Sequence, residues 1–315
     1  MKKIGLILSI LLSFNVYAQE QTSGYCGPKD AQGNFGTNCQ WSLSNGVLKI
    51  TGTGNMANFS PNNENDMPWY SYRSSIQSVS VGEGITFIGK QAFLRTSMTS
   101  ISLPESLTTI GPSAFRENSN LTSIKIPDGV TTLSYAPFLK TGITEILLPD
   151  SLSTLGDRVF RDMPNGATIV FPDKELVVND DVFLDDPNRS SELNIIIGEG
   201  ITIRETGINL SGTNDLKIYC TGNITQCRTN AGVFADNVLP ATATENKGII
   251  TYKDQNGNVL SIKDTTKKVY NEKDGSYTIY DKDGNFIGYK NKRIYTLDEA
   301  NAVAGKVNSV KIRYR

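Results

Sequence analysis

The sequence predicts a β-rich solenoid of stacked repeats, made of short parallel strands and turns, followed by a small antiparallel β module. The first observation is a phenylalanine that recurs at a nearly constant spacing of about 22 residues, at Phe93, Phe115, Phe138, Phe160 and Phe183. The second is a short apolar alternation ahead of each phenylalanine, as short half-buried strands require. The third is a C-terminal segment that lacks the repeat and carries Asn-Gly and Asp-Gly pairs between alternating apolar residues.

Residues 1–18 have the pattern of a secretory signal peptide. Lys2 and Lys3 precede an apolar run of about 11 residues, which is far short of the roughly 20 that cross a bilayer as a helix. Small residues at Val16 and Ala18 fit cleavage before Gln19. We therefore expect a secreted or cell-surface protein with no transmembrane helix in its mature chain.

Residues 19–75 are expected to cap the front of the array, where a first coil would otherwise expose its apolar side. Asn45-Gly46 lies between two alternating apolar pairs and predicts a β-hairpin. The glycines within 52–54 suggest an anion-binding loop, but no helix pattern and no Lys-Ser or Lys-Thr follows them. We therefore expect no phosphate site there.

Residues 76–239 are expected to form the solenoid. Its strands are predicted at seven apolar triplets: Val79–Val81, Ile101–Leu103, Ile124–Ile126, Ile146–Leu148, Ile169–Phe171, Ile195–Ile197 and Ile218–Cys220. Proline ends several of them because it lacks the N–H that would continue the ladder. One unit of about 22 residues cannot bury its own apolar side, so neighbouring units must stack, with the phenylalanines in one internal file.

The repeat units resemble bacterial BspA-like leucine-rich repeats. SISLPESLTTIGPSAF (Ser100–Phe115) and LTSIKIPDGVTTLSYAPF (Leu121–Phe138) follow the family pattern of a strand ending in Ile-Pro, then Val-x-x-Ile-Gly and Ala-Phe. The stretch Trp41–Met56, followed by Pro68–Tyr70, looks like the cap segment that often precedes such arrays. The resemblance implies a leucine-rich repeat fold in a secreted or surface-exposed protein that binds proteins or other ligands. It implies no catalytic residues.

Four cysteines are expected to form disulfides, because an exported protein meets an oxidising environment. Four cysteines allow three connectivities, and the sequence alone does not choose among them. We favour Cys26–Cys39 and Cys220–Cys227, because each pair lies at one end of the repeat array. Four free buried thiols are the alternative.

The C-terminal part differs in composition from the rest. Residues 240–248 are small and polar and are expected to be a flexible linker. The basic, tyrosine-rich module 249–315 follows, and 247–315 hold 14 Lys and Arg against 8 Asp and Glu, whereas 19–246 hold 15 against 24. Consecutive hairpins are predicted at Asn256-Gly257, Asp274-Gly275 and Asp283-Gly284. Two roles stay open for this module: sorting or attachment to the cell surface, and a small sheet whose tyrosines simply pack.

Other features of the module are also expected to be structural. Asp281, Asp283 and Asn285 resemble the start of a calcium loop, but Lys292 stands where that loop requires glutamate, so no calcium site is expected. Basic tyrosines can bind single-stranded nucleic acid, which export argues against. A short helix is predicted at 297–303 and a closing strand at 310–314.

The central residue of each solenoid strand points away from the core. In order these residues are Ser80, Ser102, Lys125, Leu147, Val170, Ile196 and Tyr219. The last four form an apolar stripe that a solvated face does not need. We therefore predict a partner-binding surface whose residues are Lys125, Leu147, Val170, Ile196 and Tyr219. The alternative is that the C-terminal module covers the stripe, helped by its opposite charge.

Histidine is absent, which removes the commonest general base and every catalytic pair or zinc site that needs it. A glycosidase needs paired carboxylates, and the densest acidic cluster is Asp180, Asp181, Asp185 and Asp186, on a turn where solvated acids are ordinary. We expect a non-enzymatic, adhesin-like protein without cofactor or metal that binds a protein or another macromolecular surface ligand, and not nucleic acid. The alternative is a structural or surface-assembly protein anchored by its C-terminal module.

Overall fold

The computed structural model describes residues 22–60, 66–183, 192–204, 216–246, 249–271, 276–280 and 286–291 of the 315. The chain divides into two compact units, Met1–Leu239 and Pro240–Arg315. The expected signal peptide, 1–18, lies outside the described residues. Within the part that is described, no helix has the length and apolarity needed to cross a membrane.

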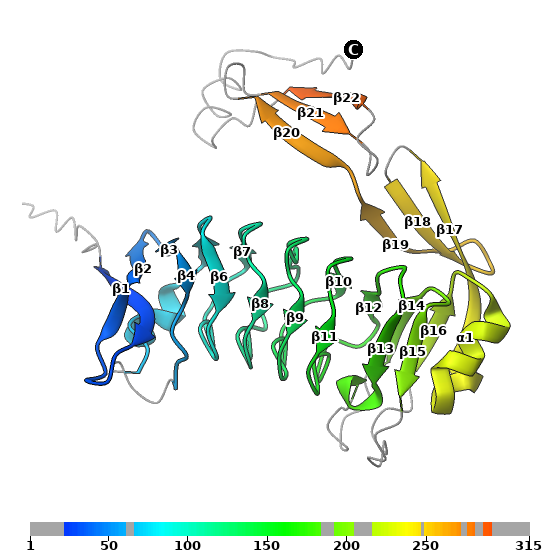
Figure 1. Cartoon of the computed structure of the whole chain (residues 1–315), viewed down its shortest axis with the longest axis horizontal. Coiled ribbons are helices and arrows are strands. Elements are labelled where there is room, and N and C mark those ends of the chain that lie inside the picture. The colour runs from blue at the N-terminus through cyan, green and yellow to red at the C-terminus, as the bar shows by residue number, and fades with distance from the viewer. Residues whose placement is uncertain are drawn as a thin grey trace, which may run out of the picture. The chain divides into compact units, whose positions relative to one another are not determined.

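The first unit is a parallel β-solenoid whose coils lie side by side and whose short strands form two stacks (Figure 1). The first stack contains β3 (Val47–Gly52), β5 (Ser78–Val81), β7 (Ser100–Ser102), β10 (Glu145–Leu147), β12 (Ala167–Val170), β14 (Leu193–Ile197) and β16 (Leu216–Cys220). The second contains β4 (Gly54–Asn55), β6 (Ile85–Ile88), β8 (Thr109–Ile110), β9 (Thr132–Leu133), β11 (Thr154–Leu155), β13 (Leu176–Asn179) and β15 (Ile201–Arg204). The predicted fold class is confirmed.

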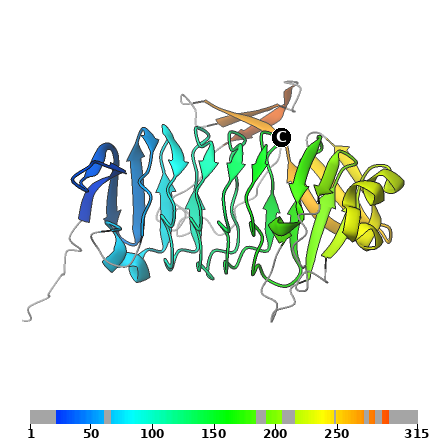
Figure 2. The same ribbon diagram turned by 60° about the horizontal axis from the view of Figure 1, so that its bottom comes forward.

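Strand pairing reproduces the sequence repeat. Ser78 lies opposite Ser100 in the first stack, and Thr109 lies opposite Thr132 in the second. These register steps match the spacing between successive phenylalanines, so one repeat makes one coil. The two stacks run along the length of the solenoid in both views (Figures 1 and 2).

The phenylalanines lie inside the solenoid as the spacing predicts. Phe93, Phe115 and Phe138 are buried, and their neighbouring ring centroids are 5.8 and 6.0 Å apart. Phe160 and Phe183 are also buried and stack on each other at 5.9 Å. Each of these coils therefore contributes one aromatic ring to the core, where it packs against the ring of a neighbouring coil.

The chain bends around each phenylalanine through residues in the left-handed backbone region. Two such residues occur in each of four coils, with φ between 46° and 62°: Gln91, Arg95, Ser113, Glu117, Ala136, Lys140, Arg158 and Asp162. None is glycine, so each of these residues costs about 1–2 kcal/mol. Hydrogen bonds between coils offset this cost. The Phe93 N–H donates to the Ala114 carbonyl, and the Phe115 N–H to the Pro137 carbonyl, both at 2.9 Å.

The third predicted triplet, Ile124–Ile126, is not a strand. Both isoleucines are buried as expected. The backbone, however, is joined to the next coil by isolated bonds such as Thr144 N–H to the Thr122 carbonyl, which is long at 3.3 Å. The core therefore continues through this coil, whereas the first stack is divided between β7 and β10.

The front of the solenoid is closed by a hairpin. β1 (Thr22–Lys29) and β2 (Phe35–Ser44) pair antiparallel, and β2 pairs in the same way with β3. The predicted turn at Asn45-Gly46 joins β2 to β3, with φ of 48° and 75°, as a type I′ turn requires. β3 also pairs in parallel with β5, so a solenoid strand precedes residue 76, where the sequence placed the first coil.

Two further features fix this front cap. The Cys26–Cys39 disulfide joins β1 to β2. Trp69, which precedes the 3-10 helix η1 (Tyr70–Ser75), continues the aromatic file: its ring lies 6.1 Å from that of Phe93. Its indole N–H donates to the carbonyl of the residue before Phe93, at 2.9 Å. The cap therefore extends the core of the array by one layer.

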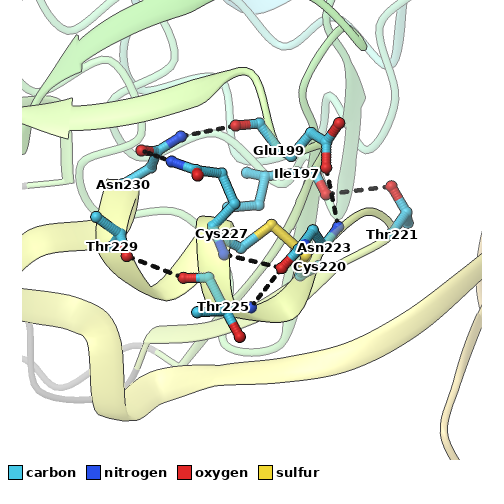
Figure 3. The surroundings of a disulfide bond; sticks show 10 residues. Ile197, Glu199, Cys220, Thr221, Asn223, Thr225, Cys227, Thr229 and Asn230 are labelled. Carbon is cyan, nitrogen blue, oxygen red and sulfur yellow. Dashed lines mark hydrogen bonds between the residues drawn. A yellow bond between two sulfur atoms is a disulfide. The ribbon is translucent and has the colours of Figure 1, made fainter.

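The back of the solenoid carries helices that the sequence pattern did not predict. They are η2 (Asp180–Phe183), α1 (Ile224–Ala231) and η3 (Gly232–Asn237). The Cys220–Cys227 disulfide fastens the end of β16 to α1 (Figure 3). The Asn223 side chain accepts the N–H groups of Thr225 and Gln226 at 3.0 and 3.1 Å and so caps this helix.

The described part of the second unit consists of antiparallel strands, the first of which begins two residues before the unit boundary. They are β17 (Val238–Asn246), β18 (Ile249–Asp254), β19 (Val259–Asp264), β20 (Lys267–Asn271), β21 (Ser276–Tyr280) and β22 (Phe286–Asn291). The predicted turn at Asn256-Gly257 joins β18 to β19, with the Asp254 carboxylate accepting the N–H groups of Asn256 and Asn258. An antiparallel β module is therefore confirmed.

The expected flexible linker at 240–248 was wrong, because β17 runs through Asn246 and pairs with β18. Threonine and alanine alternate in this strand, and such small residues fit a ladder as well as a linker. The turns at 274–275 and 283–284, the calcium-like Asp281, Asp283 and Asn285, the helix at 297–303 and the strand at 310–314 lie outside the described residues.

Candidate functional site

The open face is the outer side of the first stack, opposite the core. Its front part is polar, and we call it the polar half: Lys49, Ser78, Ser80, Ser100, Ser102, Ser123 and Lys125. Each of these side chains is exposed or half-buried. Lys49, Ser80 and Ser102 occupy matching positions of successive strands, so they form a column along the face. The polar half therefore presents hydroxyl and ammonium groups at a regular spacing.

Lys125 is the predicted binding residue that the structure leaves most accessible. Its side chain is 81% exposed, and its ammonium group lies 3.4 Å from the Glu105 carboxylate. An exposed ion pair of this kind contributes roughly 0–1 kcal/mol. The ammonium group can therefore leave Glu105 and contact a partner at little energetic cost.

The apolar stripe is not the free surface that the sequence suggested. Val170 and Ile196 are each 1% exposed, although they point away from the core, and Leu147 and Tyr219 are half-buried. Register pairs Leu147 with Val170, Val170 with Ile196 and Ile196 with Tyr219, so the four side chains do lie in one row. The two central residues of the row are nevertheless shielded from water. Exposure of Val170 and Ile196 was therefore a wrong prediction.

The polar half was not singled out as a site by the sequence reasoning. The strand pattern predicts that Ser80 and Ser102 face outward, but the predicted binding surface was placed on the apolar residues of the later strands. The available signal was Ser-x-Ser in two successive strands, Ser78-Val79-Ser80 and Ser100-Ile101-Ser102. A hydroxyl on both outward positions of adjacent strands marks a face that stays in water.

One edge of the solenoid is acidic. An exposed carboxylate lies in the turn after β5, β7, β10, β12 and β14 and after the 124–126 segment. In order these are Glu83, Glu105, Asp150, Asp173, Glu199 and, after 124–126, Asp128. Two of them stabilise the next coil: the Glu83 carboxylate accepts the N–H groups of Glu105 and Ser106, and the Glu199 carboxylate accepts that of Asn223. Some of the acidic residues of the solenoid therefore have a structural role, since their carboxylates accept hydrogen bonds from the next coil.

The acidic cluster considered for catalysis is differently placed from our expectation. Asp181 is buried, with 7% exposure, instead of solvated on a turn. Its backbone carbonyl accepts the Arg158 N–H, which ties η2 to the preceding coil. Asp185 and Asp186 lie outside the described residues. Within the described ranges, no three Asp, Glu or Cys side chains are grouped so as to hold a metal ion.

A charged cluster lies at the bends around the phenylalanines. Glu117 forms ion pairs with Arg95 and Arg116. The hydrogen bond from Arg95 is the main cause of a lowered pKa of the Glu117 carboxyl, and the same contact raises the pKa of Arg95. This cluster links two consecutive coils and is placed to stabilise the array.

Comparisons with known proteins match the repeat region. A family model described as BspA type leucine rich repeat region matches residues 68–189 in six copies. A leucine-rich repeat protein from Eubacterium ventriosum is similar at 20% identity and a TM-score of 0.41, covering 70% of this chain and 47% of that one. The chain thus spans about half of that protein.

Two further solved structures are similar over part of the chain. The T. pallidum leucine-rich repeat protein shows 18% identity and a TM-score of 0.34, covering 55% of this chain and 86% of that one. A leucine-rich cell surface protein from Faecalibacterium prausnitzii shows 13% identity and a TM-score of 0.28, covering 55% and 72%. Comparison with functionally curated proteins found no match.

Proposed function

Because residues 68–189 belong to the BspA-type leucine-rich repeat family, we propose that the chain is an exported, non-catalytic protein that binds a macromolecular partner. Export is supported by the signal-like residues 1–18 and by two disulfides, which persist in oxidising compartments. The adhesin-like role rests on the family and on the free part of the open face.

The polar half is the surface that we propose for the partner. The observation that carries this choice is its exposure, since the centre of the apolar stripe behind it is buried. Serine side chains supply adaptable hydrogen bonds in antibody paratopes, and a column of them on rigid strands can serve a protein partner in the same way. Lys49 and Lys125 add charge at either end of the polar half.

Site-specific photo-crosslinking tests this proposal. Benzoylphenylalanine would replace Ser102 on the open face or, as a matched control, Thr131, which directly precedes β9 of the second stack; both positions are exposed. After exposure to the surface proteins of the producing cell and its environment, we expect a discrete crosslinked species from position 102 alone. Equal crosslinking from both positions, or none from 102, would refute binding through the polar half.

A second candidate function is surface assembly through the C-terminal module. The observation that favours it is the sign of its charge, with 14 Lys and Arg against 8 Asp and Glu in 247–315. Fractionation of the producing cells with the full chain and with a chain lacking 247–315 tests this role. Release of the shortened chain from the cell surface supports anchoring, whereas unchanged retention excludes it.

A further inference from the structure

A groove lies at the back of the solenoid, where α1 packs beside the second-stack strands β13 and β15. Its volume is about 680 Å³, and its lining includes Glu175, Val177, Glu199, Gln226 and Asn230. This volume is within the roughly 300–1,000 Å³ typical of small-molecule sites. The groove is remote in the sequence from the polar half and involves none of its residues.

The two amide side chains of the groove are held in fixed positions. The Asn230 amide donates to the Glu199 main-chain carbonyl at 2.7 Å (Figure 3). The Gln226 amide donates to the Asn230 side-chain oxygen at 2.8 Å. Both residues are on α1, which the disulfide of Cys227 fastens to the last strand. Such support from neighbouring groups is what keeps a binding site preorganised.

These bonds leave hydrogen-bonding capacity for a ligand. Each amide uses one of its two N–H protons, so one proton on each remains, together with the Gln226 carbonyl. Glu175 and Glu199 supply acceptors from two neighbouring coils. The Lys174 ammonium donates to the Asp150 carbonyl at 2.6 Å, so it is engaged with the preceding coil.

An apolar contact completes the lining. Val177 is 51% exposed, so it offers apolar surface to a ligand in the groove. A ligand with a hydrophobic flank and hydroxyl groups at its rim matches this combination. An anion would be repelled by the carboxylates of Asp173, Glu175 and Glu199. A simple cation would be attracted by them, but it would leave the free amide protons and the apolar contact unused.

From this lining we propose that the groove binds a neutral oligosaccharide. Sugar hydroxyls donate to the carboxylates and accept from the amides, while the C–H face of a ring lies against Val177. The site would act alongside the proposed protein-binding face and would direct the protein to a glycan-coated surface. The proposal for the groove does not depend on binding through the polar half, so either proposal can fail without the other.

Saturation-transfer NMR on the full chain tests the proposal with a set of neutral tetrasaccharides, namely cellotetraose, laminaritetraose, mannotetraose and chitotetraose, and with spermine as a cationic comparison. We expect transfer from the protein to at least one tetrasaccharide. Glu175→Gln keeps the shape but removes a charged acceptor, and Gln226→Ala removes an amide. Each variant should weaken binding about tenfold, as the loss of one hydrogen bond to a charged or fixed group predicts.

Thr229→Ala is the matched control, because Thr229 is on the same helix and bonds only within it, to the Thr225 carbonyl. It should bind as the unchanged protein does. Transfer to no tetrasaccharide, or to spermine alone, would overturn the proposal. So would tetrasaccharide binding that is equal in the unchanged protein, Glu175→Gln and Gln226→Ala, since the ligand would then lie elsewhere.

Discussion

Replacing Asn118 by alanine is predicted to destabilise the solenoid more than any exposed substitution in it. Asn118 is fully buried between two coils. Its amide group donates to the carbonyls of Phe93 and Phe115, both at 2.7 Å. Its side-chain oxygen accepts the N–H of Thr96 at 2.9 Å and the Thr96 hydroxyl at 2.6 Å. The four bonds use every donor and two acceptor positions of the side chain.

The expected loss follows from this geometry. Each intramolecular hydrogen bond contributes roughly 0.5–1.5 kcal/mol net, so four of them give about 4 kcal/mol. Alanine also leaves two carbonyls and one N–H buried without that partner, which adds to the loss. A typical domain has only about 5–15 kcal/mol of stability in total. Asn118→Ala should therefore remove a large part of the stability of the coils around it.

Urea unfolding monitored by tryptophan fluorescence measures the effect. Trp41 and Trp69 are the only two tryptophans of the chain, and Trp69 packs on Phe93, next to the altered site. We expect the fluorescence midpoint to fall by the equivalent of about 4 kcal/mol. Circular dichroism follows the same titration for the whole chain.

Two further variants make the reasoning refutable. Asn58→Ala removes one bond, from the Lys90 N–H at 2.8 Å, at an exposed position, and should cost about 1 kcal/mol or less. Asn118→Thr places there the residue that a neighbouring coil uses at Thr141, whose hydroxyl donates to the Phe138 carbonyl, so it should recover part of the loss. If Asn118→Ala costs no more than Asn58→Ala, the buried network does not hold the coils together.

The remaining predictions concern the bends and the back cap. Lys140→Gly should be about 1 kcal/mol more stable than Lys140→Ala in thermal unfolding, because glycine accepts the φ of 57° there; equal stability would exclude strain at the bend. Because the pKa of Glu117 is lowered in the folded protein, its ion pairs stabilise the fold fully at pH values above 4.5, the ordinary pKa of glutamate. This stabilisation is lost as the pH falls through the pKa of the folded state. Glu117→Gln should therefore flatten the acid side of a pH–stability profile, by less than about 1 kcal/mol because Arg95 is 59% exposed, and an unchanged profile would contradict this. Replacing Cys220 and Cys227 together by serine should cost about 2 kcal/mol, measured as a lower unfolding midpoint without reductant, and no change would show that the bridge does not stabilise α1.

The repeat and its core were predictable because they follow from two regular features of the sequence, the interval between phenylalanines and the apolar triplets. The nearly constant interval between phenylalanines determines the length of a coil, and buried apolar triplets determine which side faces inward. The Asn45-Gly46 hairpin was predictable because an Asn-Gly pair by itself favours two consecutive positive φ values. The disulfide pairing followed from position at the ends of the array, and both expected bridges are present.

Other features have no comparable local signal. The bends use residues as different as Gln91 and Lys140, because contacts with adjacent coils impose the left-handed backbone there. Burial of Val170 and Ile196 depends on what covers the outer side of the sheet, which strand alternation does not reveal. α1 is mostly polar along its length, so its best signal was the capping Asn223 ahead of it.

The bends that neighbouring coils enforce have a consequence for how such a chain can change in length. Inserting or deleting one whole turn leaves every surviving turn with the same contacts above and below it. A shorter insertion puts the next bend out of step with the carbonyls that restrain it. Tandem duplication of entire turns is thus the route of growth that this architecture tolerates, and the two disulfide-bound ends stay unchanged while the middle lengthens.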